Sequence, residues 1–523
     1  MVDPANALRP RHAAWVVSAL LLVVYVVTLA PGVTYWDSGE FLAAMKSLGI
    51  PHPPGTPLYI LVGNVWGRAL EPILGFAYAV NLFSAVCTAI ACGIFASLMA
   101  RWTRNAPAGI AGGILAGLMS SVWLNANETE VYAPALLMSA LLMFAADKVS
   151  ETRESKWLVL LAYLLGLGWA LQLSALVAAP AAVLLAFAAW RSIRVPVLPM
   201  IIVAALGATV VLFMLVRARH DPGVNQGNPE TWSAFMDVLT RKQYQPVSLL
   251  PRQAPWYIQI GNFFEYADWQ VALGLHPDPP PSILRTSMTV IYAILGAIGF
   301  VWHKRSDAVS WRVMTVLFVC ATLGVIAYLN MKASPSYGHG FLPTGAKHEA
   351  RERDYFFALA FVCWGLWAGG GAVELCKRSW PRWLPVAFAV AMLPGFLNLG
   401  VTDRRRGNSE VAAADSALRI LRPAPPRAVV FAYGDNDTYP VWYAQEVEGI
   451  RRDVTTVTVP LLGARWYRAE LARRHGLLDS ASIESWRGYN AVLASICRNA
   501  KQQGRPVVAR EVRDRPKPPQ ECN

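Results

Sequence analysis

The chain has 523 residues, of which 55% are hydrophobic and 15% charged, and its formal net charge is +13. Soluble globular proteins carry about 25% charged residues. High hydrophobicity excludes a disordered chain, and seven cysteines are too few for a disulfide-rich scaffold. The composition predicts a polytopic membrane protein whose partner is the lipid bilayer. In such a protein the excess of Lys and Arg marks cytoplasmic loops, so we expect no nucleic-acid partner.

Uncharged runs long enough to cross a bilayer recur along the first four-fifths of the chain, since a crossing needs about 20 apolar residues. The first run could be a signal peptide, but further spans follow, which favours a retained helix. The run 157–190 is too long for one crossing, so we predict a hairpin that turns near residues 172–174. This gives about eleven transmembrane helices. The runs are 13–36, 72–100, 106–126, 131–146, 157–190, 195–216, 286–302, 313–331, 355–373 and 383–402.

Basic clusters between these runs set the predicted orientation. With the N-terminus in the cytoplasm, the clusters in alternate loops share one face, as the positive-inside rule requires. We therefore predict a membrane module over residues 1–402 and an extracytoplasmic domain over 403–523. The clusters are Arg9/Arg11, Arg101/Arg104, Lys148/Arg153/Lys156, Arg191/Arg194, Lys304/Arg305/Arg312 and Lys377/Arg378/Arg382. The loops on the other face are 34–68, 125–132, 217–282 and 332–354.

The C-terminal segment reads as a small α/β domain. We predict strands at 427–433 and 453–460 and helices at 440–448 and 464–475, which together form a parallel βαβ unit. Cys497 and Cys522 are the two cysteines of this segment. An oxidising compartment could pair them, and two free, inert thiols are the alternative.

The first outward loop carries a pair of carboxylates, Asp37 and Glu40, directly after Trp36. In a helix this spacing puts both on one face, and carboxylates at a membrane surface are costly unless they are solvated, paired or used. The alternative is an N-terminal capping box with Asp37 as the cap. Four prolines between residues 51 and 57 make a stiff segment around His52, which we expect to fold back toward the carboxylates.

Two further outward segments carry charge. Glu128, Glu130 and Tyr132 stand at a helix junction, where interfacial solvation is the plain alternative. Arg351 and Arg353, next to Asp354, place cations on the face where positive charge is otherwise depleted. Arginine offers a planar fork for phosphate oxygens, so these residues favour an anionic ligand; pairing with neighbouring carboxylates is the alternative and is compatible with it.

Five motifs occur in a characteristic order. They are Asp37-Ser38-Gly39-Glu40-Phe41, His52-Pro53-Pro54-Gly55, Glu130-Val131-Tyr132, Glu352-Arg353-Asp354-Tyr355 and Gly434-Asp435-Asn436-Asp437-Thr438-Tyr439-Pro440. In this order they resemble the multi-pass protein O-mannosyltransferase family that modifies IPT domains in eukaryotes and has bacterial relatives. Motifs of other chemistries, such as a Walker-type loop, His-Glu-x-x-His or Cys-x-x-Cys, are absent from the sequence.

The resemblance implies a GT-C-type glycosyltransferase in a bacterial inner membrane, with its active site in the periplasm. Its donor would be a polyprenyl-phosphate-linked sugar, mannose in the family, and its acceptor a protein Ser/Thr or a glycan. Asp37 would be the general base of an inverting transfer, with Glu40 as the second carboxylate, and Arg351 and Arg353 would neutralise the departing phosphate. No metal or cofactor is required, and a divalent ion is compatible with the scheme. The remaining substrate-binding candidates are Trp36, His52, Glu128, Glu130, Tyr132, Asp354, Asp435 and Asp437.

Two other functions fit parts of the pattern. A lipid-linked sugar flippase without transferase activity would need a polar path between both faces, whereas the polar residues gather on one. A sensor or scaffold would bind its ligand through Asp435 and Asp437 in the tail, and these two residues could equally form a capped turn.

Overall fold

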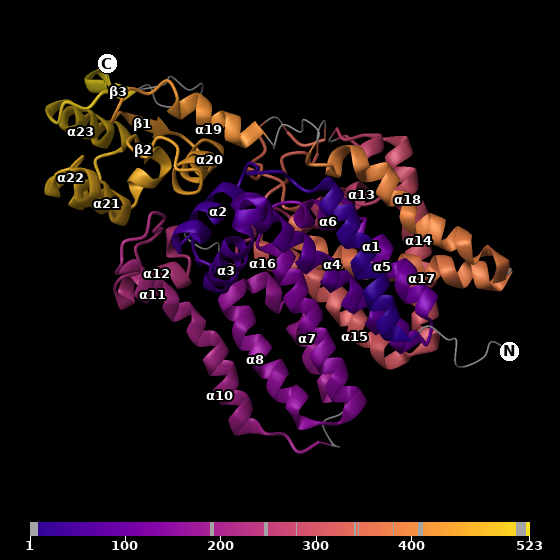
Figure 1. Ribbon diagram of the computed structural model, residues 1–523. Helices are drawn as coiled ribbons and strands as arrows, with labels where there is room; N and C mark the ends of the chain where they lie inside the picture. Colours follow the sequence, from indigo (N-terminus) through magenta and orange to yellow (C-terminus); the bar gives the residue numbers. More distant parts are fainter. Residues whose placement is uncertain are drawn as a thin grey trace. The chain divides into compact units, whose positions relative to one another are not determined.

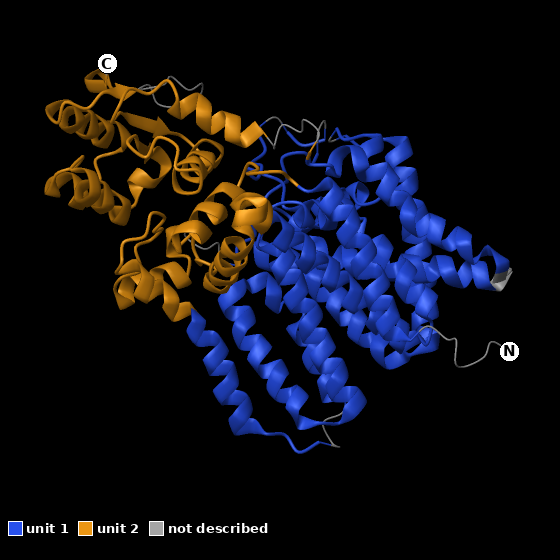
Figure 2. Ribbon diagram, in the orientation of Figure 1, with its two compact units in different colours: residues 1–29, 81–210, 247–404 blue, residues 30–80, 211–246, 405–523 orange. Residues whose placement is uncertain are grey.

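The computed structural model of the chain is mostly helical (Figure 1) and divides into two compact units (Figure 2). Unit 1 comprises residues 1–29, 81–210 and 247–404, and unit 2 comprises 30–80, 211–246 and 405–523. Arg191 and the side chain of Arg378, both assigned above to the cytoplasmic face, lie outside what is described. The structure describes residues 9–188, 193–244, 249–278, 280–338, 341–343, 345–379, 381–405, 412–508 and 519–522.

Unit 1 consists of helices that follow the predicted apolar runs. Among the described residues, eight helices are long and apolar enough to cross a membrane, or nine if a bent pair counts as one span. This confirms the polytopic helical fold, while the number of crossings stays a prediction. The helices, one of which (α4) begins in unit 2, are α1 (Pro10–Thr28), α4 (Phe76–Thr103), α5 (Ala106–Gly117), α6 (Ser120–Ala126), α7 (Tyr132–Thr152), α8 (Ser155–Leu171), α9 (Ala179–Phe187), α10 (Val197–Ala208), α13 (Trp256–Trp269), α14 (Ile283–Ser306), α15 (Ala308–Val319), α16 (Val325–Leu329), α17 (Ala358–Ser379) and α18 (Leu384–Thr402).

The long apolar run at 157–190 breaks where the hairpin was predicted. Helix α8 ends at Leu171, and a short 3₁₀ segment, Leu173–Leu176, leads into α9. The start of α8 and the end of α9 line one cavity of about 210 Å³ together with the start of α10. Because the two far ends meet at this cavity, the chain reverses direction between them.

Helix α17 forms the centre of unit 1, with most of its span buried. It packs against α5 and α14 at unusually short range, because glycines stand at the crossing points. A Cβ atom at Gly369 would lie 2.4 Å from the backbone nitrogen of Gly112, and one at Gly371 would lie 2.1 Å from the carbonyl oxygen of Leu295. Small residues at such crossings allow the dispersion contacts that hold membrane helices together.

The bent pair, α5 and α6, turns by 72° between Gly117 and Ser120. Buried amides satisfy the backbone groups that the bend frees. The side-chain nitrogen of Asn398 donates to the carbonyl of Leu118, and the backbone nitrogen of Ser120 donates to the carbonyl of Gln270. Non-helical backbone at membrane depth is tolerated when protein groups satisfy it in this way. The bend carries the chain into the predicted outward segment 125–132.

Unit 2 contains a three-stranded parallel sheet with the order β2-β1-β3. Val429 pairs with Thr455 on one side and with Val507 on the other. The strands and helices fall on the predicted βαβ pattern, and the α/β assignment is confirmed. The elements are α2 (Ser38–Ser47), α3 (Pro57–Leu74), α11 (Leu212–Ala218), α12 (Trp232–Leu239), α19 (Ala413–Leu421), β1 (Val429–Ala432), α20 (Asp435–Glu446), β2 (Thr455–Thr458), α21 (Arg465–His475), α22 (Ser480–Glu484), α23 (Tyr489–Gln502) and β3 (Val507–Val508).

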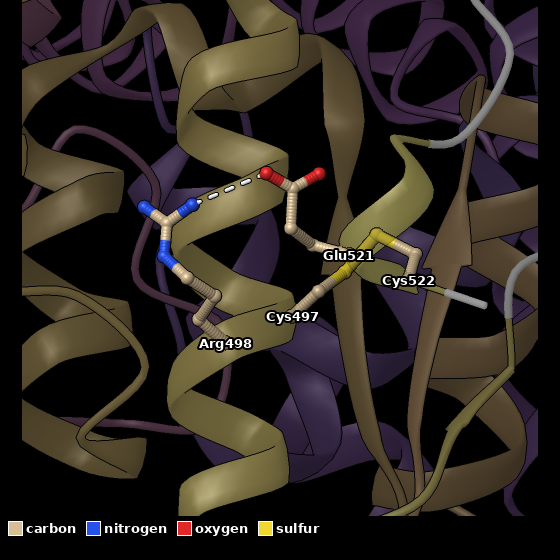
Figure 3. Close-up of a disulfide and its surroundings, with 4 residues drawn as sticks. All are labelled: Cys497, Arg498, Glu521 and Cys522. Carbon is tan, nitrogen blue, oxygen red and sulfur yellow. Dashed lines mark hydrogen bonds and ion pairs between the residues drawn. A yellow bond between two sulfur atoms is a disulfide. The ribbon is translucent and has the colours of Figure 1, made fainter.

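A disulfide joins α23 to the C-terminal segment (Figure 3). Cys497 and Cys522 are bonded, and Arg498 next to the first cysteine pairs with Glu521 next to the second at 3.4 Å. Cys497 also belongs to the apolar core that packs on the sheet. Of the two alternatives for these cysteines, the structure contains the paired one.

Candidate functional site

The first group of predicted site residues lies at the start of α2 in unit 2. Asp37 occupies the N-cap position with φ −72° and ψ −13°, and its side chain makes no capping hydrogen bond to the helix. The residue before it, Trp36, adopts a left-handed conformation with φ 63°. The capping-box alternative for Asp37 and Glu40 is therefore wrong, because the structure directs the Glu40 carboxylate elsewhere.

Glu40 is fully buried and its carboxylate accepts three hydrogen bonds. The Oε1 atom accepts from the backbone nitrogen of His52 at 2.8 Å and from the side-chain amide of Gln226, and Oε2 lies 2.5 Å from Nδ1 of His52. A buried carboxylate is stable only when it is paired in this way. Because both of its oxygens accept hydrogen bonds, Glu40 holds together the segments that carry His52 and Gln226.

The proline-rich segment folds back onto Glu40 through a short parallel bridge. Ile50 pairs with Asn225: the nitrogen of Ile50 donates to the carbonyl of Val224 at 2.8 Å, and the nitrogen of Gln226 donates to the carbonyl of Ile50 at 2.9 Å. The bridge brings His52 and Gln226 to the same carboxylate, from segments far apart in the sequence.

The start of α20, which follows β1, contacts the start of α2, although the two contacting residues are 400 positions apart. The backbone nitrogen of Trp36 donates to Oδ1 of Asn436 at 2.8 Å. A Cβ atom at Gly39 would lie 2.5 Å from the carbonyl oxygen of Tyr439, so only glycine permits this approach between α2 and α20. Within unit 2, the first and the last of the five motifs therefore form one site.

Two tyrosines respond to the negative charge of this site. Burial, and then the charges of Glu40, Asp435 and Asp37, raise the pKa of Tyr439 well above its usual value. Desolvation and the same three carboxylates also raise the pKa of Tyr244. Both phenols therefore keep their protons at neutral pH and remain hydrogen-bond donors beside the carboxylates.

The two aspartates of the last motif have different surroundings. Asp437 closes the turn after β1, since its Oδ2 accepts from the backbone nitrogen of Tyr433 at 3.4 Å. Asp435, the first residue of α20, is exposed. Both lie in the first turn of α20, where the helix dipole stabilises negative charge, and at the carboxyl end of the central strand, which is the ligand-binding edge of parallel sheets.

Sequence reasoning missed four residues of this site: Gln226, Tyr244, Asn436 and Tyr439. Asn436 and Tyr439 stand inside the last motif and could have been found from it. Gln226 and Tyr244 lie in the long aromatic loop 217–282, and no local pattern separates them from their neighbours there.

The second group lies in unit 1, around the segment that leads into α17. The guanidinium of Arg351 stacks over the ring of Tyr355, 4.7 Å from its centroid, and Nη1 of Arg353 donates to the Tyr355 hydroxyl at 2.9 Å. The ring of Tyr132, on α7, packs against Tyr355 with centroids 4.5 Å apart. Nη2 of Arg353 also lies 3.7 Å from Glu349, so the predicted local pairing is present, together with two half-buried guanidinium groups.

The carboxylates between these arginines anchor the segment. Oε1 of Glu352 accepts from the backbone nitrogen of Ser336 at 3.0 Å, and Oε2 accepts from the hydroxyl of Tyr266 at 3.1 Å. Asp354 accepts from the hydroxyl of Ser121 at 2.5 Å, which ties the segment leading into α17 to the bent pair α5–α6. Asp354 was expected to bind substrate, and its observed contact is with the protein.

The acidic residues at the junction before α7 are also placed by protein contacts. Glu128 lies 3.3 Å from the guanidinium of Arg404, and Glu130 is 6% exposed. Between them, Thr129 donates to the side chain of Asn81 at 2.6 Å. Within the described ranges, no three His, Cys, Asp or Glu side chains form a group that could hold a metal ion.

Comparison with known proteins finds two stretches of the chain that are similar to one family. Residues 37–194 match the model of the "Protein O-mannosyl-transferase TMEM260 N-terminal domain", and residues 413–490 match "TMEM260-associated domain 2". Protein O-mannosyl-transferase TMEM260 of Mus musculus is 32% identical over 156 residues, which are 29% of this chain and 21% of the relative. Its counterpart in Dictyostelium discoideum is 24% identical over 123 residues, 23% of this chain and 15% of the relative. The match therefore spans about a fifth or less of these relatives.

Solved structures give the fold. ArnT from Cupriavidus metallidurans in the apo state aligns over 82% of this chain and 84% of its own, with a TM-score of 0.51 and 14% identity. A second structure of ArnT, bound to undecaprenyl phosphate, aligns over 86% and 91% with a TM-score of 0.48 and 13% identity.

The fold and the order of the site motifs define the class: a multi-pass membrane protein with the GT-C glycosyltransferase fold. Two stretches of the chain, residues 37–194 and 413–490, are similar to domains of the TMEM260 protein O-mannosyl-transferases.

Proposed function

We propose that the protein is an inverting membrane glycosyltransferase that moves a sugar, mannose in the first instance, from a polyprenyl-phosphate donor to the hydroxyl of an extracytoplasmic acceptor. The observation that carries the proposal is the unit 2 site. Asp37 stands there at the start of α2, near a buried carboxylate that accepts three hydrogen bonds from the protein and near two tyrosines that stay protonated.

In the proposed reaction the acceptor oxygen attacks the anomeric carbon of the donor. Its proton passes to the carboxylate of Asp37, a C–O bond forms to the acceptor, and the bond to the phosphate oxygen breaks with its electron pair on phosphate. One displacement inverts the configuration. A positioned carboxylate base contributes roughly a hundred- to ten-thousand-fold to such a rate.

Arg351 and Arg353 are assigned to the phosphate of the donor. Two guanidinium groups held against the ring and the hydroxyl of one tyrosine have little rotational freedom left to lose on binding. Their fork geometry suits phosphate oxygens, and their charge would stabilise the leaving group as the bond breaks. The ArnT protein, whose fold this chain shares, has been solved with undecaprenyl phosphate bound, which supports the donor class.

The acceptor and the location of the chemistry belong to the same proposal. The name of the mouse relative, a protein O-mannosyl-transferase, supports a Ser or Thr hydroxyl of a protein as the acceptor. The distribution of basic residues supports a cytoplasmic N-terminus and an extracytoplasmic site, in the inner membrane if the source is bacterial. The disulfide in the tail is consistent with that side.

The test uses the full-length protein in proteoliposomes with a labelled polyprenyl-phosphate-mannose donor and extracytoplasmic proteins of the host as acceptors. We expect acceptor labelling and release of polyprenyl phosphate by the native protein, and a loss of at least about a hundred-fold in Asp37→Asn, which keeps the size of the side chain.

A control variant makes that loss interpretable. Asp415→Asn, on α19 of the same unit, removes a carboxylate outside the site and should leave transfer unchanged. Movement of the donor across the bilayer without any transfer product would instead identify a flippase, and unchanged transfer in Asp37→Asn would remove Asp37 from the role of base.

A further inference from the structure

The first turn of α20, directly after β1 in unit 2, makes a hydrogen bond that the proposed chemistry does not use. Oδ1 of Asn436 accepts from the backbone nitrogen of Trp36 at 2.8 Å. Asn436 belongs to the last sequence motif, and Trp36 is the residue immediately before the proposed base. The contact therefore links the α/β region to the backbone that carries Asp37.

The backbone at Trp36 needs such support. Its φ of 63° is in the left-handed region, which a bulky non-glycine residue adopts at a cost of about 1–2 kcal/mol. Backbone strain of this kind persists only where surrounding contacts fix it. The hydrogen bond to Asn436 acts on the peptide unit at this residue, and the left-handed turn determines where the next residue, Asp37, begins α2.

A second contact, on the C-terminal side of Asp37, also restricts the position of α2. The carbonyl oxygen of Tyr439 lies so close to Gly39 that a Cβ atom there would approach it to 2.5 Å. The start of α2 is thus held at two points by the first turns of α20, one on each side of Asp37. A shift of α20 would move the Asp37 carboxylate with it.

We infer that Asn436 is a positioning residue for the proposed transfer: through Trp36 it fixes the left-handed turn that sets the Asp37 carboxylate at the start of α2. The inference rests on the proposed function and deepens it. It makes the α/β region part of the catalytic apparatus, in addition to any binding of acceptor by Asp435. The step affected is orientation of the base, since Asn436 itself transfers no proton.

The experiment measures backbone protection and turnover in the same full-length protein. Asn436→Ala removes the acceptor, and we expect faster hydrogen exchange in the peptide 33–41 and a kcat about 10- to 100-fold lower, because a base displaced by an ångström loses about that much. The KM for the polyprenyl-phosphate-mannose donor should change by less than about three-fold, since the base is not a binding group for the donor.

Two further variants separate positioning from loss of folding. Asn436→Asp keeps an oxygen at the same place, so protection of peptide 33–41 should return to the native level and kcat should recover above that of Asn436→Ala. Asn436→Leu keeps the size without an acceptor and should behave like alanine. The matched control is Asn499→Ala on α23, which also removes an asparagine hydrogen bond from the same unit, to Leu477, and should leave peptide 33–41 protected.

Three results overturn the inference: unchanged protection of peptide 33–41 in Asn436→Ala and Asn436→Leu, faster exchange with a kcat within about two-fold of native, or no recovery of protection in Asn436→Asp. If the native protein transfers no sugar, the proposed function fails by itself, and the exchange measurement still decides whether Asn436 holds Trp36.

Discussion

Glu40 and His52 form a closed pair in which each carboxylate oxygen meets a different nitrogen of the histidine: Oε1 accepts from the backbone nitrogen at 2.8 Å and Oε2 lies 2.5 Å from Nδ1. Gln226 adds a third donor to the buried carboxylate. This arrangement makes Glu40 the anchor of the proline-rich segment, and it separates the roles of the two carboxylates that the sequence presents together.

Variants of Glu40 test whether its role differs from that of Asp37. In Glu40→Gln the amide can still accept from the backbone nitrogen and can donate to Nδ1 of His52 in its other tautomer, so we expect transfer within about ten-fold of native. Glu40→Leu leaves buried donors unpaired, at about 1–3 kcal/mol each, and should lower both the melting temperature and transfer. Parallel assays of transfer and thermal unfolding check this. A Glu40→Gln variant as inactive as Asp37→Asn would show that Glu40 takes part in the chemistry as an acid or base.

The close contact at Gly39 predicts that a larger side chain at this position lowers transfer. Because a Cβ atom at this position would meet the carbonyl of Tyr439 at 2.5 Å, Gly39→Ala must push α2 and α20 apart, at a cost of about 1–3 kcal/mol. We expect transfer to fall by at least about ten-fold. Gly32→Ala is the matched control, since nothing lies within 4 Å of a Cβ there. Equal activity of the two variants would show that the close approach of α2 to α20 does not affect transfer.

The sequence could predict what short-range patterns determine. Apolar runs located the helices of unit 1, and alternating turn and β-branched segments located β1, α20 and β2, because these depend on neighbours in the chain. The stiffness of the segment around His52 correctly indicated a fold toward the carboxylates. These elements account for most of the fold.

Long-range pairings were beyond such reasoning. The bond between Trp36 and Asn436 joins residues 400 positions apart, and the bond between Glu40 and Gln226 joins residues 186 apart. Glu40 could be read as part of a capping box because the local spacing fits one. The bridge between Ile50 and Asn225, which brings donors to its carboxylate, depends on tertiary packing that spacing does not encode.

Arg353 predicts an effect on donor affinity. Arg353→Lys keeps the charge but loses the planar fork and the contact with the Tyr355 hydroxyl. We expect the KM for the polyprenyl-phosphate donor to rise about ten-fold, equivalent to about 1.4 kcal/mol. Initial rates across a donor titration measure it. Arg382→Lys, at an exposed arginine just past the end of α17, is the control. An unchanged KM in Arg353→Lys would remove this residue from the phosphate site.

The Cys497–Cys522 disulfide predicts both a stability effect and a location. It closes a segment with a sequence separation of 25, so Cys522→Ser should destabilise the sheet region by about 3 kcal/mol. Limited proteolysis with and without reductant measures this, with Cys376→Ser as the control. If the tail is extracytoplasmic, the disulfide forms in cells. Protein denatured in the presence of an alkylating reagent should then be labelled at five thiols without prior reduction and at seven after reduction. Seven labelled thiols without reduction would contradict the predicted side.

Glu265, on α13, predicts a pH dependence of stability. Its carboxylate accepts from the hydroxyl of Ser334 at 2.6 Å. Burial raises its pKa to about 7; the negative charges of Glu352 and Asp268 act in the same direction, whereas the Ser334 bond and the charge of Arg285 oppose it. A carboxyl in an unfolded chain has a pKa of about 4.3. Between these two values the folded protein keeps a proton that the unfolded chain has released, so stability falls as the pH rises from about 4 to 7 and stays low above it.

The variant Glu265→Gln carries the neutral form at every pH and removes this loss. We expect its melting temperature to exceed the native one least at pH 5 and by roughly 2–4 °C at pH 8, where the native carboxylate is charged and poorly solvated. Thermal unfolding of the full-length protein between pH 5 and 8 measures the difference, and Glu230→Gln, at an exposed position, should give curves parallel to native. A carboxylate that must ionise for function would lose activity on this substitution. Unchanged transfer in Glu265→Gln, together with the pH-dependent gain in melting temperature, would therefore show that Glu265 has a structural role in α13. Parallel curves for Glu265→Gln and native protein would show that the carboxyl titrates normally.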